Sequence, residues 1–244
     1  MFQVAICLVA CFFFEKVLPR NRTLSSFAQF RTGALWLLAN VVILPLIIAN
    51  LSWHVGQFFF LQGVGGGSKA VQFFIGFLVL DFAKYVIHYA FHRIPFLWNF
   101  HKVHHSIEYL TALSSFRISW VEGIINLLAA VIVCSLLGLQ IEVVFIINMI
   151  SMMACLLQHA NFRMPFTNWL EKIFVTPDNH TYHHSKRFKH PHGQNFGFVL
   201  NIWDRLFKTY TYPQNVDQEE IGLADEKMPD RFERQFFYPF IKSE

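Results

Sequence analysis

Three clusters of histidine stand out in this sequence because imidazole is a common ligand for transition metals. The pattern His-x3-His begins at His88, and the pattern His-x2-His-His occurs twice, beginning at His101 and at His180. On a helix, positions i, i+3 and i+4 share one face, so each cluster can direct its imidazoles into one space. The eight histidines of the clusters are His88, His92, His101, His104, His105, His180, His183 and His184.

The number of histidines indicates more than one metal ion. A tetrahedral zinc ion is complete with four ligands, whereas the clusters supply eight imidazoles. Two metal ions that share these ligands fit the count, and iron, zinc, copper and nickel all accept neutral imidazole. A purely structural role is the alternative, but chance does not readily produce two His-x2-His-His patterns in a chain with 12 histidines. Metal binding is therefore the favoured interpretation.

Apolar segments must position these clusters. Five of them lie at residues 2–18, 34–60, 71–90, 121–137 and 141–157. Several approach the roughly 20 residues that a membrane span requires. The first is short and is interrupted by Glu15 and Lys16, so it is either a marginal span or an interfacial helix. It lacks the basic start and the cleavage site of a signal peptide, which predicts that it is retained.

Two short connections shape the expected fold. Only Gly138-Leu139-Gln140 separates the last two apolar segments, which predicts a tight helical hairpin. Pro95 lies between the first two histidine clusters and lets the chain turn out of a spanning helix. We predict an all-α polytopic membrane bundle of about four to five spans with a helical, histidine-rich cap. Residues 1–244 are expected to form one domain, with a catalytic core at about 77–210 and a polar tail at about 213–244.

Composition supports a membrane protein and excludes other classes. Hydrophobic residues make up 54% of the chain and charged residues 15%, against roughly a quarter charged in ordinary soluble proteins. The net charge of +4 is small and scattered, so no nucleic-acid partner is expected. The four cysteines lie in apolar stretches without a CxxC pair, which predicts small buried side chains rather than disulfides or a zinc ribbon.

The distribution of basic residues predicts the orientation. Arg20, Arg22 and Arg31 follow the first apolar segment, whereas the glycine-rich turn at 63–68 is followed only by Lys69. The positive-inside rule then places the three clusters on the cytosolic face. The glycine run lacks the Lys-Ser/Thr ending of a phosphate loop, so it is weak evidence for nucleotide binding.

The order HYAFH, HKVHH and HTYHH resembles the fatty acid hydroxylase/sterol desaturase superfamily of membrane di-iron enzymes. Other landmarks match as well: QHANF from residue 158, TPD from 176, NFG from 195 and WDRLF from 203. The resemblance covers about residues 77–210. It implies two non-haem iron ions, O2 as co-substrate, a lipid substrate in the bilayer and a multi-pass protein of the bacterial inner membrane or the endoplasmic reticulum.

The resemblance also implies roles for individual residues. The eight cluster histidines correspond to iron ligands, and His159 corresponds to an additional ninth ligand. His190 and His192 are expected beside the site or on the surface, and His54 is expected to be structural. Three acidic residues are expected either to orient ligand imidazoles or to serve as caps and ion-pair partners: Asp81, Asp178 and Asp204.

Two departures from the superfamily pattern concern its landmarks. Ser119 stands where many members have a histidine, and Lys208 stands where a glycine is common. Neither removes one of the eight cluster ligands. They leave the subfamily open.

The implied reaction is hydroxylation or desaturation of a lipid C–H bond, the lipid being a sterol, a fatty acyl chain or a related compound. Ether-lipid cleavage of the alkylglycerol monooxygenase kind and carotenoid hydroxylation are alternatives that the ligand set does not separate. A membrane metal transporter or scaffold is the non-enzyme alternative, but transporters usually place polar ligands near the midplane of the bilayer. Electrons are expected from a separate ferredoxin or cytochrome b5-like donor. Its docking surface, or a lipid headgroup contact, is expected at Lys186, Arg187 and Lys189.

Overall fold

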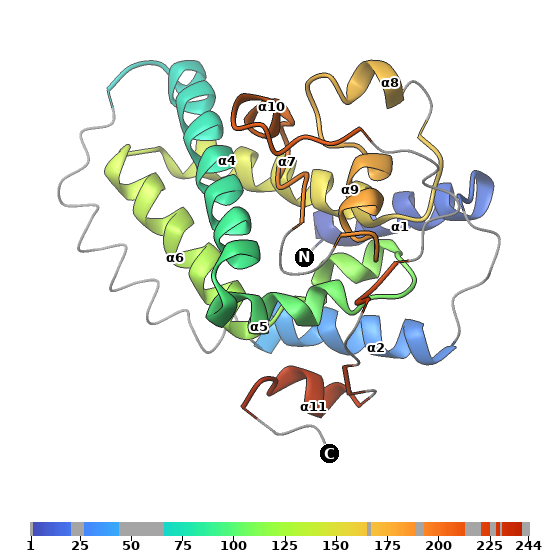
Figure 1. Ribbon diagram of the computed structural model, residues 1–244. Helices are drawn as coiled ribbons and strands as arrows, with labels where there is room; N and C mark the ends of the chain where they lie inside the picture. Colours follow the sequence, from blue (N-terminus) through green and yellow to red (C-terminus); the bar gives the residue numbers. More distant parts are fainter. Residues whose placement is uncertain are drawn as a thin grey trace.

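The computed structural model of the chain is built from helices (Figure 1). It describes residues 2–20, 27–43, 66–164, 167–188, 193–212, 221–224, 228–229 and 231–240. Within these ranges β-structure is limited to isolated bridges. The prediction of an all-α chain is confirmed for the described residues. The single-domain prediction stays a prediction, because much of the polar tail lies outside them.

Six longer helices form most of the described fold: α1 (Phe2–Val17), α2 (Phe27–Leu38), α4 (Lys69–Arg93), α5 (Pro95–His105), α6 (Trp120–Leu136) and α7 (Ile141–His159). Short helical elements complete it: a π-helical turn (Ala39–Ile43), the 3-10 turn η2 (Ala112–Phe116), α8 (Thr167–Leu170), α9 (Pro177–His183), α10 (Ile202–Leu206) and α11 (Phe232–Phe236).

Among the described residues, α4 and α7 are the helices long and apolar enough to cross a membrane, with mean hydropathies of 1.7 and 2.0. The 25 residues of α4 correspond to a length of about 37 Å. Both helices expose large apolar side chains, such as Phe74 (64%) and Ile141 (72%), which lipid accommodates better than water. The predicted four to five spans stay a prediction, because α6 is a shorter apolar helix and residues 44–60 lie outside the described ranges.

The chain turns sharply between α4 and α5, as Pro95 predicts. Ile94 is extended (φ −100, ψ 112), and its N–H donates to the Ala90 carbonyl at 2.9 Å. A residue before proline disfavours the helical conformation, whereas proline itself fits the first turn of a helix. As a result, α5 leaves the end of α4 at a steep angle (Figure 1).

The predicted tight turn between α6 and α7 is confirmed, but the two helices diverge from it rather than pairing as a hairpin, and each packs against α4 (Figure 1). Gly138 adopts a φ of +59, which only glycine reaches without steric cost. Leu139 then packs with Leu80 of α4 and Ile147 of α7 in a buried apolar cluster. The Gln72 side chain on α4 accepts a hydrogen bond from the backbone N–H of Gln140 at 3.0 Å, which anchors the turn to α4.

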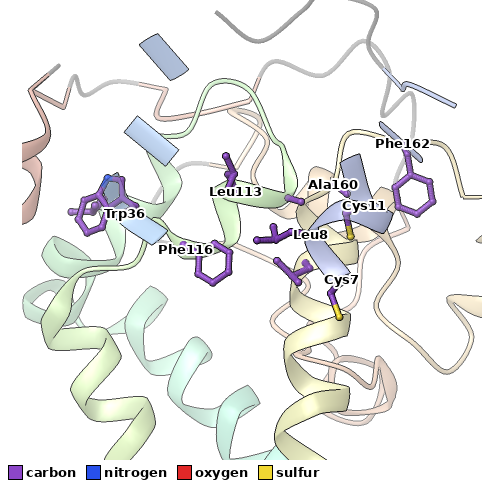
Figure 2. Close-up of a cluster of buried hydrophobic side chains, with 11 residues drawn as sticks. Cys7, Leu8, Cys11, Trp36, Leu113, Phe116, Ala160 and Phe162 are labelled. Atoms are coloured by element: carbon purple, nitrogen blue, oxygen red, sulfur yellow. The ribbon is translucent and has the colours of Figure 1, made fainter. Parts of the chain in front are cut away.

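A second apolar cluster joins the N-terminal helices to the end of α7 (Figure 2). Its buried members are Cys7, Leu8, Cys11, Trp36, Val103, Ala112, Leu113, Phe116, Leu156, Ala160 and Phe162. Cys7, Cys11 and Cys134 are buried free thiols, and Cys155 is a half-buried free thiol, as predicted for cysteines used as small apolar side chains.

Glu15 explains how a charged residue fits at the end of the first apolar segment. Its carboxylate accepts hydrogen bonds from the backbone N–H groups of Ala112 (2.8 Å) and Asn161 (3.0 Å). These donors belong to η2 and to the segment after α7. The carboxylate therefore fixes α1 to η2 and to the end of α7, which carries His159.

Candidate metal centre

Nine buried or half-buried histidines gather in two groups. The five-histidine group contains His88, His92, His101, His105 and His183. The four-histidine group contains His104, His159, His180 and His184. Within each group, one nitrogen atom from every imidazole lies within 4.8 Å of the others. These are the nine histidines that the sequence and the family resemblance select.

Four helices deliver these side chains. The end of α4 carries His88 and His92, α5 carries the HKVHH cluster, α7 ends at His159, and α9 carries the HTYHH cluster. The short helix α9 is stabilised at its start by Pro177 and by Thr176, whose side chain accepts from the backbone N–H of Asn179 at 3.2 Å. This proline and threonine set where the third cluster begins its helical turn.

The expectation that each cluster serves one space is wrong for the second and third clusters. His101 and His105 join the five-histidine group, whereas His104 joins the four-histidine group. Likewise, His180 and His184 lie in the four-histidine group and His183 in the other. Only the i, i+4 pairs stay together, because neighbouring residues point about 100° apart around a helix. Each cluster therefore bridges both groups.

The nitrogens of the four-histidine group converge closely. His159 Nε2 lies 3.2 Å from His104 Nε2 and 3.0 Å from His180 Nε2, and His180 Nε2 lies 3.3 Å from His184 Nε2. With a metal–nitrogen bond of about 2.1 Å, neighbouring ligands lie about 3.0 Å apart around an octahedral ion and about 3.4 Å apart around a tetrahedral one. The observed separations fall within this range.

The protonation of two of these rings calls for a cation between them. His104 Nδ1 donates to the carbonyl of Arg117 at 3.1 Å, and His159 Nδ1 donates to the carbonyl of Cys155 at 2.8 Å. A carbonyl can only accept, so in the neutral rings both Nε2 atoms carry a lone pair rather than a proton. Two lone pairs 3.2 Å apart repel each other. A metal ion converts this repulsion into two bonds, so the donor set fits a metal.

The five-histidine group has the same design. His88 Nδ1 lies 3.0 Å from the Phe196 carbonyl, and His183 Nδ1 lies 2.6 Å from the Gln194 carbonyl. These contacts direct both Nε2 atoms inward, where His183 Nε2 lies 3.1 Å from His105 Nε2. The buried Nε2 atoms of His88 and His101 have no hydrogen-bond partner in the described part of the chain. Inward-facing nitrogens without partners are what a metal ion requires.

Glu122 contacts His101 from outside the group. Its two carboxylate oxygens lie 3.0 and 3.1 Å from His101 Nδ1, and the residue is only 7% exposed. Glu122 lies in the first turn of α6, where Ser119 accepts from its backbone N–H. A carboxylate that accepts from a ligand histidine fixes the ring and makes it a stronger ligand. The sequence interpretation did not assign this role to Glu122.

Two of the three aspartates that the sequence singled out, Asp81 and Asp204, accept hydrogen bonds from the loop after Asn195 rather than from a histidine ring. Asp204 accepts from the N–H groups of Phe196 (2.7 Å) and Gly197 (2.6 Å). Asp81 accepts from Val199, Leu200 and the Trp203 indole, at 2.8 to 3.1 Å. Burial raises the pKa of the Asp204 carboxyl, and its hydrogen bonds oppose that shift. Both residues stabilise the loop whose Phe196 carbonyl orients His88.

Asp178 serves as an ion-pair partner, which is one of its predicted roles. It forms an ion pair with Arg20, which links the segment after α1 to α9. The remaining predicted positions, His54, His190 and His192, lie outside the described residues.

The electrostatic environment keeps the imidazoles ready for metal binding. Burial lowers the pKa of His104, His105, His180 and His184 well below 6.5, and neighbouring imidazoles lower it further. The rings are therefore neutral near pH 7, which is the form that binds metal ions. The site can hold transition metals without first releasing protons from these four rings.

Comparison with known proteins agrees with this site. The sequence profile described as fatty acid hydroxylase matches residues 73–209, which is more than half of the chain. The chain is 32% identical to the ornithine lipid hydroxylase OlsE of Rhizobium tropici over 173 residues, covering 71% of this chain and 51% of that protein. It is 30% identical to a cholesterol 25-hydroxylase-like protein of Danio rerio over 175 residues, covering 69% and 66%.

A third relative is the alkylglycerol monooxygenase of Homo sapiens, 28% identical over 145 residues, covering 55% of this chain and 29% of that protein. The chain thus spans about half the length of OlsE and less than a third of the human protein. No solved structure gives a significant match.

Proposed function

The chain belongs to the fatty acid hydroxylase family, and on that premise we propose that it is a membrane enzyme that hydroxylates a C–H bond of a lipid with O2. The observation that carries this proposal is the convergence of nine histidines on two points, with unprotonated nitrogens facing each other. Two non-haem iron ions are the metals that fit both this ligand set and the family.

In this proposal the five-histidine group holds one iron ion and the four-histidine group holds the other. The metals, when bound, supply the activation of O2, for which protein side chains alone are not suited. The reaction consumes O2, two electrons and two protons, and it converts R–H into R–OH and water.

The protein contributes geometry and a dry environment. Backbone carbonyls and Glu122 hold the imidazoles in fixed orientations, as described above. Large aromatic side chains cover the five-histidine group: the His92 ring lies 5.1 Å from the ring centroids of both Trp98 and Phe196. Phe196 is fully buried and Phe91 is 1% exposed. Exclusion of water protects a reactive oxidant from side reactions.

The position of the site favours a lipid substrate. The C-terminal ends of α4 and α7 carry His88, His92 and His159 of the two groups. Among the described residues, α4 and α7 are the candidate spanning helices. A molecule dissolved in the bilayer can therefore reach the centre along the helices. We propose that this end faces the cytosol, as the basic residues after α1 indicate, and that a separate ferredoxin or cytochrome b5-like protein delivers the electrons there.

A second candidate function is oxidative cleavage of ether lipids. Alkylglycerol monooxygenases of Danio rerio, Caenorhabditis elegans and Homo sapiens are 27–28% identical to the chain. In this alternative the same site hydroxylates the carbon next to an ether oxygen, and the product then separates into an alcohol and an aldehyde.

Lipid analysis of cells with and without the chain, grown under isotopically heavy O2, tests the proposal. We expect one lipid class to gain a single heavy oxygen atom only when the chain is present. An ether lipid that disappears with release of an aldehyde would identify the second candidate instead. A new double bond without heavy oxygen would show desaturation, and an unchanged lipid profile together with metal transport across vesicles would overturn the enzymatic proposal.

A further inference from the structure

We propose that Lys84 binds an anionic oxygen of the lipid substrate, so that the enzyme acts on an acidic lipid whose carboxylate or phosphate lies beside the metal centre. This inference rests on the proposed function, because it names the substrate class of the same site. Four observations support it: the position of Lys84, its surroundings, the lack of an ion pair to a described residue and the charge of the centre.

Lys84 lies on α4 four residues before His88. Residues at i and i+4 share one face of a helix and lie about 6 Å apart along its axis. Lys84 is therefore one turn farther from the C-terminal end of α4 than the centre itself. Nine residues separate it from Arg93 at the end of the helix, which corresponds to about 13 Å. This depth places the lysine within the apolar part of the span.

The ammonium group of Lys84 points toward other elements of the protein. Its nitrogen lies 3.9 Å from the centroid of the Phe198 ring, in the loop that also orients His88. Cys155 on α7, Asp81 on α4 and Cys134 on α6 are near enough to interact with it electrostatically. Cys155 lies one turn before His159, whose ring it contacts. The cation therefore lies where α4, α6 and α7 come together, next to the metal ligands.

Lys84 forms no side-chain ion pair with a described residue. None of the ion pairs found there includes it. Asp81, one turn earlier on the same helix, already accepts from three donors in the loop after Asn195. A cation without an ion-pair partner inside a membrane span is costly and is usually retained because it binds something. The ring of Phe198 occupies one side of the ammonium, which leaves donors for a ligand.

The charge of the centre favours an anion at this place. Nine neutral imidazoles around two divalent ions leave the positive charge of the metals without an anionic protein ligand. Among the described residues, Glu122 is the acid that contacts a ligand ring. Lys84 adds a further positive charge one turn away. Both charges attract a carboxylate or a phosphate in a low-dielectric environment, whereas the charge of Lys84 does not stabilise a bound neutral sterol or carotenoid.

Binding of three lipids by the purified, iron-loaded protein tests the inference without requiring turnover. The probes are a long-chain fatty acid, phosphatidylglycerol and the fatty alcohol with the same chain as the acid. We expect the wild type to bind at least one of the two anionic lipids more tightly than the alcohol, and the preferred one identifies the carboxylate or the phosphate as the ligand. In Lys84→Gln that affinity is expected to fall by about tenfold or more, while the affinity for the alcohol stays unchanged.

Three further variants complete the experiment. Lys84→Arg is expected to retain the preference for the anionic lipid because it keeps the charge. Lys84→Met removes the charge with an apolar side chain that suits the span, so it replaces Lys84→Gln if that variant does not fold. Lys69→Gln is the matched control, because Lys69 lies at the other end of α4, where it pairs with exposed Glu142 at 3.4 Å.

The inference is overturned if loss of the Lys84 charge leaves the affinity for both anionic lipids unchanged. It is also overturned if the affinity for the alcohol falls by the same factor. Failure of the inference is distinct from failure of the proposed function. Oxygen incorporation into a lipid combined with unchanged anion binding in Lys84→Gln would reject only the role of Lys84. Charge-dependent binding without any oxidised lipid would reject only the enzymatic proposal.

Discussion

The substitution His104→Ala is expected to abolish lipid oxidation and to remove one iron ion from the centre, while the protein still inserts into the membrane. His104 Nε2 lies 3.2 Å from His159 Nε2 within the four-histidine group. Its loss leaves three imidazoles in that group. Removal of a residue that only supports a ligand typically reduces metal affinity or activity by 10- to 100-fold. Loss of a ligand itself should therefore exceed about 100-fold.

Iron content and product formation, measured on the same preparation, check this expectation. His54→Ala is the control, since His54 lies outside the three clusters in the sequence. It should leave both quantities unchanged. A His104→Ala protein that keeps its full iron content and oxidises lipid at the wild-type rate would remove His104 from the site.

The substitution Glu122→Gln is expected to lower the iron affinity of the five-histidine group without removing a ligand. Both carboxylate oxygens of Glu122 lie within 3.1 Å of His101 Nδ1. The neutral amide is a weaker acceptor and makes His101 a poorer metal ligand. The expected loss of iron affinity is about 10- to 100-fold, as for other partners of ligand histidines. Glu122 is thus a positioning residue that acts through His101.

Competition with a chelator measures this effect directly, and the Mössbauer spectrum of the iron should change because one ligand becomes less basic. Glu142→Gln is a suitable control, since Glu142 is exposed at the start of α7, where it pairs with Lys69. Unchanged iron affinity and an unchanged spectrum in Glu122→Gln would show that the contact with His101 has only a structural role.

Local sequence patterns predicted much of the fold and most of the site. The spacing of the histidines, the turn at Pro95 and the turn at Gly138 all depend on residues close together in the chain. The structure brings together the nine histidines that the clusters and the family resemblance select. The family resemblance itself is confirmed by the profile match to residues 73–209.

Helix geometry separates adjacent histidines, but spacing alone could not predict which of the two groups each of them joins. His104 and His105 are adjacent in sequence but belong to different groups. Which ring faces which group depends on how α5 and α9 are oriented against α4 and α7. That orientation arises from contacts between residues far apart in the chain, such as Arg20 with Asp178 of α9.

The role of Glu122 was not predicted from the sequence for a related reason. A serine followed three residues later by a glutamate is a common helix start, and Ser119 does accept from the backbone of Glu122. The side chain, however, turns to His101, which lies 21 residues earlier. A carboxylate at the start of an apolar helix, with histidine clusters nearby in the sequence, is the signal that could have identified it.

The iron content of the purified protein is the most direct test of the central claim. If the five- and four-histidine groups each hold one ion, elemental analysis of the protein extracted from membranes should find about two iron ions per chain. Bound zinc in place of iron, or a single ion per chain at saturation, would contradict the assignment of two iron sites.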